Sequence, residues 1–509
     1  MVGKDLSGGS RLRAMSTLGE SLPQEKAPII EALRRYRGTV RFHMPGHRGV
    51  GADPELASLL GPQALSCDVT GVPGLDDLHE PHGCIEDAEK LAAQAFGADK
   101  TFFSVNGTTS AIQSMVMAAL GEGDALIIPR NVHKSILSAI ILTGARPVFA
   151  LPSYDPYLGF AFGVEESSIA KCLRENSKPK AALLVNPTYY GTATDLTPVA
   201  ARLHEAGALL LVDEAHGPHF RFHPRLPKPT LDSGADAVAQ GAHKMIGALT
   251  QASFLHVKGS RMDPARLKAS FQFLTSTSPS YLLLASLDAA RRQMALHGRE
   301  LIQKALELAA VLRDLVNEVP GLYSFGEEAV GRPGFDSLDL TKVTVTVREL
   351  GITGYRAEKY LRERWGIQVE MSDLYNILVI VSFANTLEEV RRLVHALQAL
   401  VEAVKSGELD RDLIRAQKSI PELPPVPMMA MTPSNAVRAP YERVTLHDAR
   451  DRVSAEVVTC YPPGIPILYP GEVIGRDSID YLELVRGLAF GVSGPEDRSL
   501  RTLRVVKDS

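Results

Sequence analysis

The chain has 509 residues, of which 45% are hydrophobic and 22% are charged, and its formal net charge is −4. This length exceeds one ordinary core and predicts two or three globular domains, while the weak net charge and the lack of a long basic run argue against nucleic-acid binding. No stretch is long and apolar enough to cross a bilayer, and the four scattered cysteines are typical of a reducing compartment. We therefore expect a cytoplasmic protein without nucleic-acid or membrane partners.

The N-terminal arm, residues 1–50, begins with a polar, glycine-rich lead that contains no signal-peptide core. Residues 1–14 are either a disordered extension or a stretch that precedes a native start at Met15. The sequence leaves both interpretations open.

Residues 51–295 are expected to form a large α/β domain. Between residues 86 and 257, amphipathic helical stretches alternate with short apolar runs, the pattern of a mostly parallel sheet covered by helices. The expected buried strands are residues 125–128, 147–151, 181–185 and 208–212. One helix is predicted to end at Gly97, a left-handed C-cap, after apolar residues at helical spacing: Ile85, Ala88, Leu91, Ala92, Ala95 and Phe96.

Three further regions follow the large domain. Residues 296–415 are expected to form a smaller α/β domain, entered through a long helix over residues 286–319. It should contain strands at 342–347 and 377–383 and a helix at 386–404. Residues 416–428 are typical of an extended proline-rich linker, and residues 429–509 are expected to form a small C-terminal α+β domain.

A candidate anion site follows the apolar run at residues 101–105. There, Asn106-Gly107-Thr108-Thr109-Ser110 opens a predicted helix that extends to about residue 120. Free N–H groups and hydroxyls at a helix N-terminus suit a phosphate dianion, because the helix dipole favours negative charge there. An ordinary N-cap built from the same residue types is the alternative.

The segment Asp213-Glu214-Ala215-His216 comes directly after the predicted strand at residues 208–212. An apolar strand with this ending also resembles the Walker-B element of nucleotide hydrolases. The chain contains no GxxxxGK[ST] loop to hold a nucleoside triphosphate, so we set the ATPase interpretation aside. Asp213 is then either a helix-capping aspartate or a functional carboxylate at a strand end.

Several histidines at short spacing are candidate metal ligands: His216, His219 and His223, with His43 and His47. Phe220 and Phe222 alternate with polar residues between them, which predicts an extended segment that scatters the imidazoles over two faces. We therefore expect no metal site and interpret these histidines as surface or supporting residues.

Lys244 lies among small and apolar residues, in Ala239-Gln240-Gly241-Ala242-His243-Lys244-Met245. This setting predicts a confined amine whose pKa is lowered by desolvation, although a solvated surface charge is the default for any single lysine. Pyridoxal phosphate chemistry needs an amine for the cofactor aldehyde and a carboxylate that keeps the ring nitrogen protonated. Lys244 and Asp213 are a candidate for that pair.

Taken together, the motifs of this chain resemble those of the Orn/Lys/Arg decarboxylases, in particular the shorter members without a receiver-like wing domain. The resemblance extends through nearly the whole chain. Its motifs are His43-Met44-Pro45-Gly46-His47-Arg48-Gly49, Gly74-Leu75-Asp76-Asp77-Leu78, Phe102 to Thr109, Arg130-Asn131-Val132-His133-Lys134-Ser135, Asn186-Pro187-Thr188-Tyr189-Tyr190-Gly191, Asp213 to His216, His243-Lys244, Tyr461-Pro462-Pro463-Gly464-Ile465-Pro466 and Pro470-Gly471-Glu472.

The resemblance implies the PLP-dependent transferase fold (fold type I), with a mostly parallel seven-stranded sheet in the large domain. It also implies pyridoxal 5'-phosphate as the cofactor. Lys244 is then the Schiff-base lysine, Asp213 partners the pyridine nitrogen, and His133 stacks on the ring.

Further roles are implied in the same way. Gly107, Thr108 and Thr109 would hold the phosphate. Ala215 and His216 would pack against the other side of the cofactor, and His243 would assist proton transfer. Glu472 would receive the distal cation of the substrate.

One departure from the family pattern lies beside the lysine. Gly241 stands where the family has serine, usually another phosphate ligand. A hydrogen bond to a charged group contributes about 1.5–3 kcal/mol, so the sequence predicts that Gly241→Ser tightens cofactor binding.

The function implied is decarboxylation of a basic L-amino acid for polyamine biosynthesis, with arginine ahead of lysine and ornithine. An aminotransferase of the same fold and a catalytically impaired cofactor-binding regulatory protein are the alternatives. We also expect a homodimer or larger homo-oligomer with active sites at the subunit interface.

Overall fold

The computed structural model describes residues 22–176, 178–411, 423–461, 465–488 and 491–508. The extension expected at residues 1–14 lies outside the described residues. So do residues 416–422 of the expected linker and the Pro462-Pro463-Gly464 part of the C-terminal motif.

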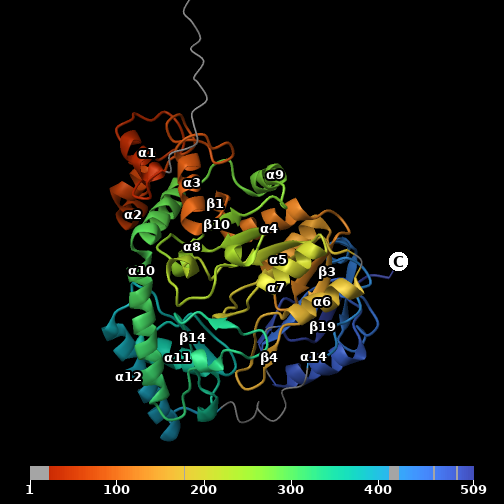
Figure 1. Cartoon of the computed structure of the whole chain (residues 1–509). Helices are drawn as coiled ribbons and strands as arrows, with labels where there is room; N and C mark the ends of the chain where they lie inside the picture. Colours follow the sequence, from red (N-terminus) through yellow and green to blue (C-terminus); the bar gives the residue numbers. More distant parts are fainter. Residues whose placement is uncertain (1–21, 177, 412–422, 462–464, 489–490, 509) are drawn as a thin grey trace, which may run out of the picture.

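A seven-stranded sheet forms the centre of the large α/β unit (Figure 1). Its order is β1-β10-β9-β8-β6-β2-β3. The strands are β1 (Lys100–Ser104), β2 (Ala125–Pro129), β3 (Arg146–Ala150), β6 (Ala181–Val185), β8 (Leu209–Asp213), β9 (Ala237–Gln240) and β10 (Ser253–Val257). β3, β2, β6, β8 and β9 are parallel, whereas β10 runs antiparallel to β9 and β1. The mostly parallel sheet is confirmed, and the four expected strands match β2, β3, β6 and β8.

Helices cover both faces of this sheet because its strands are apolar on both sides. α4 (Gly107–Ala119), α5 (Lys134–Thr143) and α9 (Pro264–Leu274) pack on one face, and α6 (Glu166–Glu175) and α7 (Thr197–Glu205) on the other. Along β8, Leu211 contacts the first layer and Leu210 and Val212 the second, as the alternation of side chains along a strand requires. The crossover helices thereby bring the strand ends to one edge of the sheet.

The antiparallel edge of the sheet is covered by N-terminal helices and by the start of a long helix. α1 (Pro28–Tyr36), α3 (Cys84–Phe96) and the first turns of α10 (Tyr281–Asn317) pack against Phe103 and Phe254. α2 (Pro54–Cys67) lies nearby, and α3 ends at Gly97 in the expected left-handed conformation. Figure 1 shows α10 running along one side of the molecule, from the large sheet to the smaller one. Even α10 lacks the apolar window needed to cross a membrane, as do the other helices in the described ranges.

The smaller α/β unit has a three-stranded antiparallel sheet, in the order β12-β14-β13. Its elements are β12 (Lys342–Thr346), α11 (Gly354–Trp365), β13 (Met371–Ser372), β14 (Asn376–Ile380) and α12 (Leu387–Lys405). A capping box between Thr386 and Glu389 starts α12 close to where the sequence predicts it. The expected strand at 377–383 ends earlier, because the Asn385 side chain accepts from the Ser382 N–H and turns the chain.

The C-terminal region packs beside β3 and below α6 (Figure 1). It contains α13 (Pro433–Arg438), β15 (Tyr441–Thr445), β16 (Val458–Tyr461), β17 (Ile465–Leu468), α14 (Arg476–Leu488), β18 (Gly491–Ser493) and β19 (Thr502–Val506). β15 pairs with β19, and β16 pairs with β17 and β18. Two-stranded pairs elsewhere are formed by β4 (Tyr154–Asp155) with β5 (Phe160–Ala161) and by β7 (Thr192–Ala193) with β11 (Ser337–Leu338).

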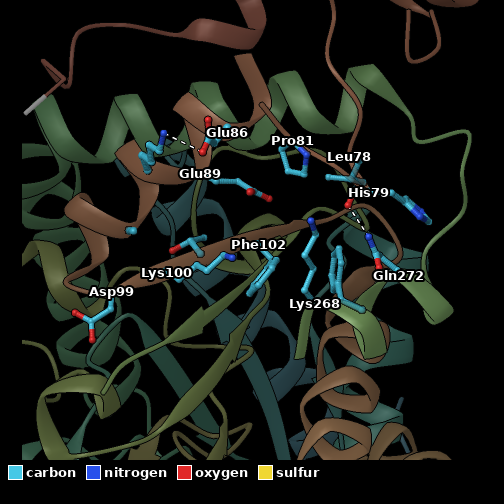
Figure 2. A pocket seen from close by; sticks show the side chains of 14 residues that line it. Leu78, His79, Pro81, Glu86, Glu89, Asp99, Lys100, Phe102, Lys268 and Gln272 are labelled. Atoms are coloured by element: carbon cyan, nitrogen blue, oxygen red, sulfur yellow. Dashed lines mark hydrogen bonds and ion pairs between the residues drawn. The ribbon is translucent and has the colours of Figure 1, made fainter. Parts of the chain in front are cut away.

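A buried carboxyl group protects the free edge of β1. Glu89 on α3 is 7% exposed, and its Oε1 accepts from the Phe103 N–H at 2.9 Å. Figure 2 shows the carboxyl facing a hollow of about 270 Å³, toward which Lys100 and Lys268 also extend. Burial raises the pKa of Glu89 from 4.5 to about 8, against the opposing effects of the Phe103 N–H and Lys100.

This burial predicts a pH-dependent stability that Glu89→Gln removes. Because the pKa is raised in the folded state, the folded protein keeps a proton that the unfolded chain releases above its pKa of 4.5. The contribution is full below that value and is lost as the pH rises to about 8. Glutamine retains the acceptor for the Phe103 N–H but does not titrate. The free energy of unfolding should therefore fall with pH less steeply in the variant than in the native protein, by up to ~1.4 kcal/mol per pH unit in this window. Unfolding curves across the window measure the difference, and parallel pH profiles would contradict it.

Candidate active site

The candidate site lies at the carboxyl edge of the parallel strands. Asp213 ends β8, Asn186 follows β6, and Gly241 follows β9. The Asn186 N–H donates to the Asp213 carbonyl at 3.1 Å, which ties neighbouring strand ends together. This edge is where open α/β sheets place reactive side chains.

Asp213 is a buried carboxylate, 5% exposed, whose Oδ1 accepts from the Ala215 N–H at 3.1 Å. Burial raises its pKa, and the nearby Lys244 and the Ala215 N–H oppose that shift. The carboxylate therefore has the charge of Lys244 acting on it, and one of its oxygens is engaged by its own turn. These properties suit a partner for a protonated ring nitrogen.

Lys244 lies on the short helix α8 (Ala242–Met245), and its Nζ is 3.0 Å from His216 Nε2. Burial lowers the pKa of Lys244, while the carboxylates of Asp213 and Glu370 oppose the shift. The direction is the one predicted from the small and apolar neighbours. A confined amine of this kind exchanges covalent bonds with an aldehyde more readily than a solvated lysine does.

A second buried lysine, which sequence reasoning missed, lies on the opposite side of His216. Lys342 starts β12, is 1% exposed, and has its Nζ 2.8 Å from His216 Nδ1. Burial lowers its pKa to about 8, against the opposing charge of Asp339. The available signal was a lysine at the head of a run, Lys342-Val343-Thr344-Val345-Thr346, that packs as a buried strand.

The N-terminus of α4 forms the expected anion cradle. Gly107 has a φ of +77°, and in the described part of the chain no side chain caps the helix. The N–H groups of Gly107, Thr108 and Thr109 are therefore available to a ligand. Thr108 Oγ1 lies 3.0 Å from the hydroxyl of Ser253 on β10, so Ser253 supports the cradle without any sequence signal.

Two further expected residues border this region. His133 is the N-cap of α5, and its Nδ1 accepts from the Ser135 N–H at 3.2 Å. Burial, and then the charge of Lys244, lower the pKa of His133, which favours the neutral ring. His243 Nδ1 lies 3.0 Å from the Ala252 carbonyl and donates to it, which leaves Nε2 as the acceptor.

A cavity of about 450 Å³ adjoins these residues. Its lining includes His133, Asn186, Thr188, Tyr189 and Asp373. The Tyr189 ring lies 4.4 Å from the His216 ring, and its centroid is 6.0 Å from Lys244 Nζ. The cavity is thus linked to the amine through Tyr189, which lines it, and is large enough for a small organic substrate.

The structure gives Glu472 a different partner from the one expected. Its side chain is fully buried, and its two oxygens accept from Arg130 Nη1 and Nη2 at 2.7 and 2.9 Å. The Tyr469 N–H donates to the same carboxylate at 2.7 Å. This ion pair joins the C-terminal region to the loop after β2 and engages both oxygens of the carboxylate that was expected to receive the substrate cation.

The histidines do not converge. Residues Phe220–Phe222 form a 3-10 turn, so the expected extended segment is wrong. His219 faces Asp339 at 3.2 Å, His223 faces Gln303 at 3.0 Å, and His47 faces Asp68 at 2.9 Å. Among the described residues, no group of three or more metal-ligating side chains is present.

Comparison with known proteins identifies the family. Residues 27–389 match the major domain of the Orn/Lys/Arg decarboxylases, and residues 415–494 match their C-terminal domain. The chain belongs to the Orn/Lys/Arg decarboxylase family. It is 45% identical to an arginine decarboxylase of Halalkalibacterium halodurans, over 95% of this chain and 98% of that protein. An arginine decarboxylase of Bacillus subtilis is 44% identical over 96% of this chain and 99% of that protein.

The fold agrees with this family. A solved lysine decarboxylase of Pseudomonas aeruginosa superimposes with a TM-score of 0.80 and 27% identity, over 94% of this chain and 80% of that one. The expected α/β architecture of the PLP-dependent transferases, fold type I, is thereby confirmed, and so are the decarboxylase activity and the pyridoxal phosphate cofactor. The donor set fits that cofactor, because a buried carboxylate, a confined amine and an uncapped helix N-terminus lie at one sheet edge.

The environment of Gly241 argues against the tighter cofactor binding that the sequence predicts for Gly241→Ser. A Cβ at this position would lie 2.9 Å from the Ala215 carbonyl oxygen and 3.1 Å from Thr108 Oγ1. The Ala215 carbonyl belongs to the backbone and also accepts from the Gly241 N–H, so it cannot easily move. Overpacking of this kind costs about 1–3 kcal/mol, as much as one added hydroxyl contact contributes.

We therefore expect Gly241→Ser to bind pyridoxal phosphate no more tightly than the native protein and to unfold at a lower denaturant concentration. Gly241→Ala is the matched control, because it adds the Cβ without the hydroxyl. Equilibrium binding of the cofactor to each variant separates the two contributions. Tighter binding by the serine variant than by the native protein would restore the original expectation.

Proposed function

We propose that this decarboxylase acts on arginine and releases carbon dioxide and agmatine as a step toward polyamines. The observation that carries the proposal is the 44–45% identity to two arginine decarboxylases over nearly the full length of each chain. Lysine and ornithine are the competing substrates, since they carry the same amino-acid head with a different distal cation. Transamination is the alternative reaction of the same fold, and the family match speaks against it.

Bound pyridoxal phosphate supplies an aldehyde that captures the substrate amine and a ring that accepts the electron pair of the breaking bond. We propose Lys244 as the residue that holds this aldehyde between turnovers. Its Nζ is confined, partly shielded from water, and 3.0 Å from His216. When substrate arrives, the same amine is positioned to hold or return a proton beside the substrate α-carbon.

Asp213 is proposed to keep the ring nitrogen protonated, because a buried carboxylate stabilises a neighbouring positive charge strongly in a poorly hydrated site. The N–H groups of Gly107, Thr108 and Thr109 are proposed to bind the phosphate. His133 is proposed to lie against one face of the ring, and Ala215 and His216 against the other. His243, whose Nδ1 donates to the Ala252 carbonyl, is proposed to assist proton transfer by taking up and returning a proton at Nε2.

Glu370 replaces Glu472 as the proposed receiver of the distal cation. It is exposed, precedes β13, and accepts a hydrogen bond from the Tyr189 hydroxyl at 2.5 Å. Tyr189 lines the cavity beside Lys244, and the charge of Glu370 acts on both Lys244 and Lys342. An acidic group beside this cavity suits a substrate with a cation at the far end of its side chain.

We also propose a cytoplasmic homodimer or larger homo-oligomer whose active sites lie at the subunit interface. The exposed apolar side chains of the N-terminal arm support this: Val40, Phe42, Met44 and Val50. The division into residues 51–295, 296–415 and 429–509, with an arm before and a linker at 416–428, is proposed as well. Separate hydrophobic cores for the large and small units support it.

The experiment that tests the substrate is carbon dioxide release by the purified, cofactor-loaded protein with arginine, lysine and ornithine. We expect the highest kcat/KM with arginine. Glu370→Gln should raise KM for arginine roughly tenfold with a smaller change in kcat, since a charge-assisted hydrogen bond is lost. Glu363→Gln, an exposed glutamate on α11, is the matched control. Preference for lysine or ornithine would overturn the arginine proposal, and an unchanged KM would overturn the role of Glu370.

A further inference from the structure

The His216 ring lies between two lysine amines. Its Nε2 is 3.0 Å from Lys244 Nζ, and its Nδ1 is 2.8 Å from Lys342 Nζ. A neutral imidazole has one N–H and one lone pair, so it accepts on one side and donates on the other. One lysine must therefore donate to the ring while the other receives a hydrogen bond as a free amine.

The ring is neutral in this setting. Burial, followed by the charges of Lys342 and Lys244, holds the pKa of His216 well below its ordinary value. His219 and His243 act in the same direction. A protonated ring would present an N–H to both amines and could accept from neither. The tautomer of His216 consequently decides which lysine carries the extra proton.

Asp339 favours Lys342 as the charged member. This carboxyl is completely buried, yet its pKa lies below the usual value, because His219 and Lys342 outweigh the effect of burial. Burial lowers the pKa of Lys342 only to about 8, so at neutral pH Lys342 is still charged and contributes positive charge near this buried carboxylate. Lys342 as the donor leaves Nε2–H of His216 directed at Lys244.

Groups on several elements around Lys244 act on its protonation, some favouring the charged form and some the free amine. Asp213 on β8 and Glu370 before β13 favour a charged Lys244. Burial favours the free amine, and the His133 ring at the start of α5 is close enough for its pKa to be lowered by the Lys244 charge. Burial and the two carboxylates act on the pKa of Lys244 in opposite directions, and a hydrogen bond donated by His216 would add to the effect of burial.

The aliphatic part of the Lys342 side chain lies close to a tight turn. Gly191 has a φ of +88°, and a Cβ there would lie 2.8 Å from Lys342 Cγ and 2.9 Å from its Cβ. Any side chain at position 191 would therefore collide with the Lys342 side chain, so the turn of the Asn186–Gly191 motif approaches Lys342 closely only because of this glycine. The Tyr189 ring centroid lies 5.7 Å from Lys342 Nζ on the same side. The Lys342 side chain is thus closely surrounded, with its amine 2.8 Å from Nδ1 of His216.

We propose that Lys342 is a positioning residue that sets the tautomer of His216, so that Nε2–H donates to Lys244 and holds the cofactor-binding amine in its free-base form. The proposal rests on the proposed role of Lys244. Its consequence is that Lys244, once displaced by a substrate amine, stays ready to bond the cofactor again at neutral pH.

The test measures the free-base fraction of Lys244 directly. Cofactor-depleted full-length protein is labelled with trace acetic anhydride over a range of pH, and the Lys244 peptide is quantified by mass spectrometry. In Lys342→Met we expect the midpoint of labelling to rise by about one pH unit, so that labelling below the midpoint falls about tenfold. Recovery of cofactor absorbance after addition of pyridoxal phosphate should slow by a similar factor at neutral pH and recover at high pH. A uniform loss at every pH, or an unchanged midpoint, would overturn the proposal.

A double-mutant cycle separates the tautomer effect from simple charge repulsion between the lysines. In a His216→Phe background, Lys342→Met should no longer change the labelling midpoint of Lys244. An undiminished shift in that background would show that Lys342 acts through space, and would overturn the proposal. Borohydride reduction of the native holoenzyme tests the role of Lys244 separately from that of Lys342. Cofactor trapped on another lysine would refute the role of Lys244, whatever the labelling midpoints show.

Discussion

Replacing Lys244 with alanine is expected to abolish decarboxylation, with a fall in kcat on the order of 10³-fold or more. The amine is proposed to form the covalent link with the cofactor and to hold a proton beside the substrate α-carbon, and alanine does neither. Peptide mass analysis after borohydride reduction should find the cofactor on Lys244 in the native protein and on no residue in the variant. Cofactor binding should weaken without vanishing, because Asp213 and the N-terminus of α4 are unchanged.

Lys405→Ala is the matched control for this experiment. This lysine lies at the end of α12, is exposed, and pairs with the exposed Glu402 on its own helix. Its substitution should leave both turnover and labelling intact. Full activity in Lys244→Ala, or a label on another lysine, would contradict the proposed site as a whole.

Glu472→Ala is expected to destabilise the folded protein by about 3–5 kcal/mol, since it leaves the buried Arg130 guanidinium without its counter-charge. Arg130 also donates to the carbonyls of Pro466 and Ile467, and its Cζ lies 4.6 Å from the centroid of the Phe149 ring. The ion pair therefore joins the C-terminal region to the large sheet. Denaturant unfolding of the holoenzyme, followed by circular dichroism, measures the loss.

The double variant Arg130→Met with Glu472→Met separates the charge effect from general damage. Removing both charges leaves neither uncompensated, so part of the stability should return, although the carbonyls of Pro466 and Ile467 lose a donor. If Glu472→Ala instead kept full stability and raised KM for arginine alone, Glu472 would be a substrate ligand, as the resemblance implied.

Much of the large sheet follows from local signals. The run at residues 181–185 matches β6 at both ends, and the helix predicted after Asn106 is α4. Such elements are predictable because hydrophobic periodicity, helix caps and turn residues act over only a few positions. The antiparallel pairing of β10 with β9 and β1 has no such local mark, since strand order depends on how the crossover helices pack.

The features of the candidate site likewise fall into those set by local sequence and those set by long-range contacts. The sequence by itself determined the family, the cofactor class and the segments that supply Lys244, Asp213 and the α4 N-terminus, because each is a short motif with its own chemistry. Only the tertiary structure decided that Glu472 pairs with Arg130, that Gly241 is crowded by a backbone carbonyl, and that Lys342 meets His216. Those contacts join residues far apart in the chain, and burial in the folded core sets both their distances and their charges.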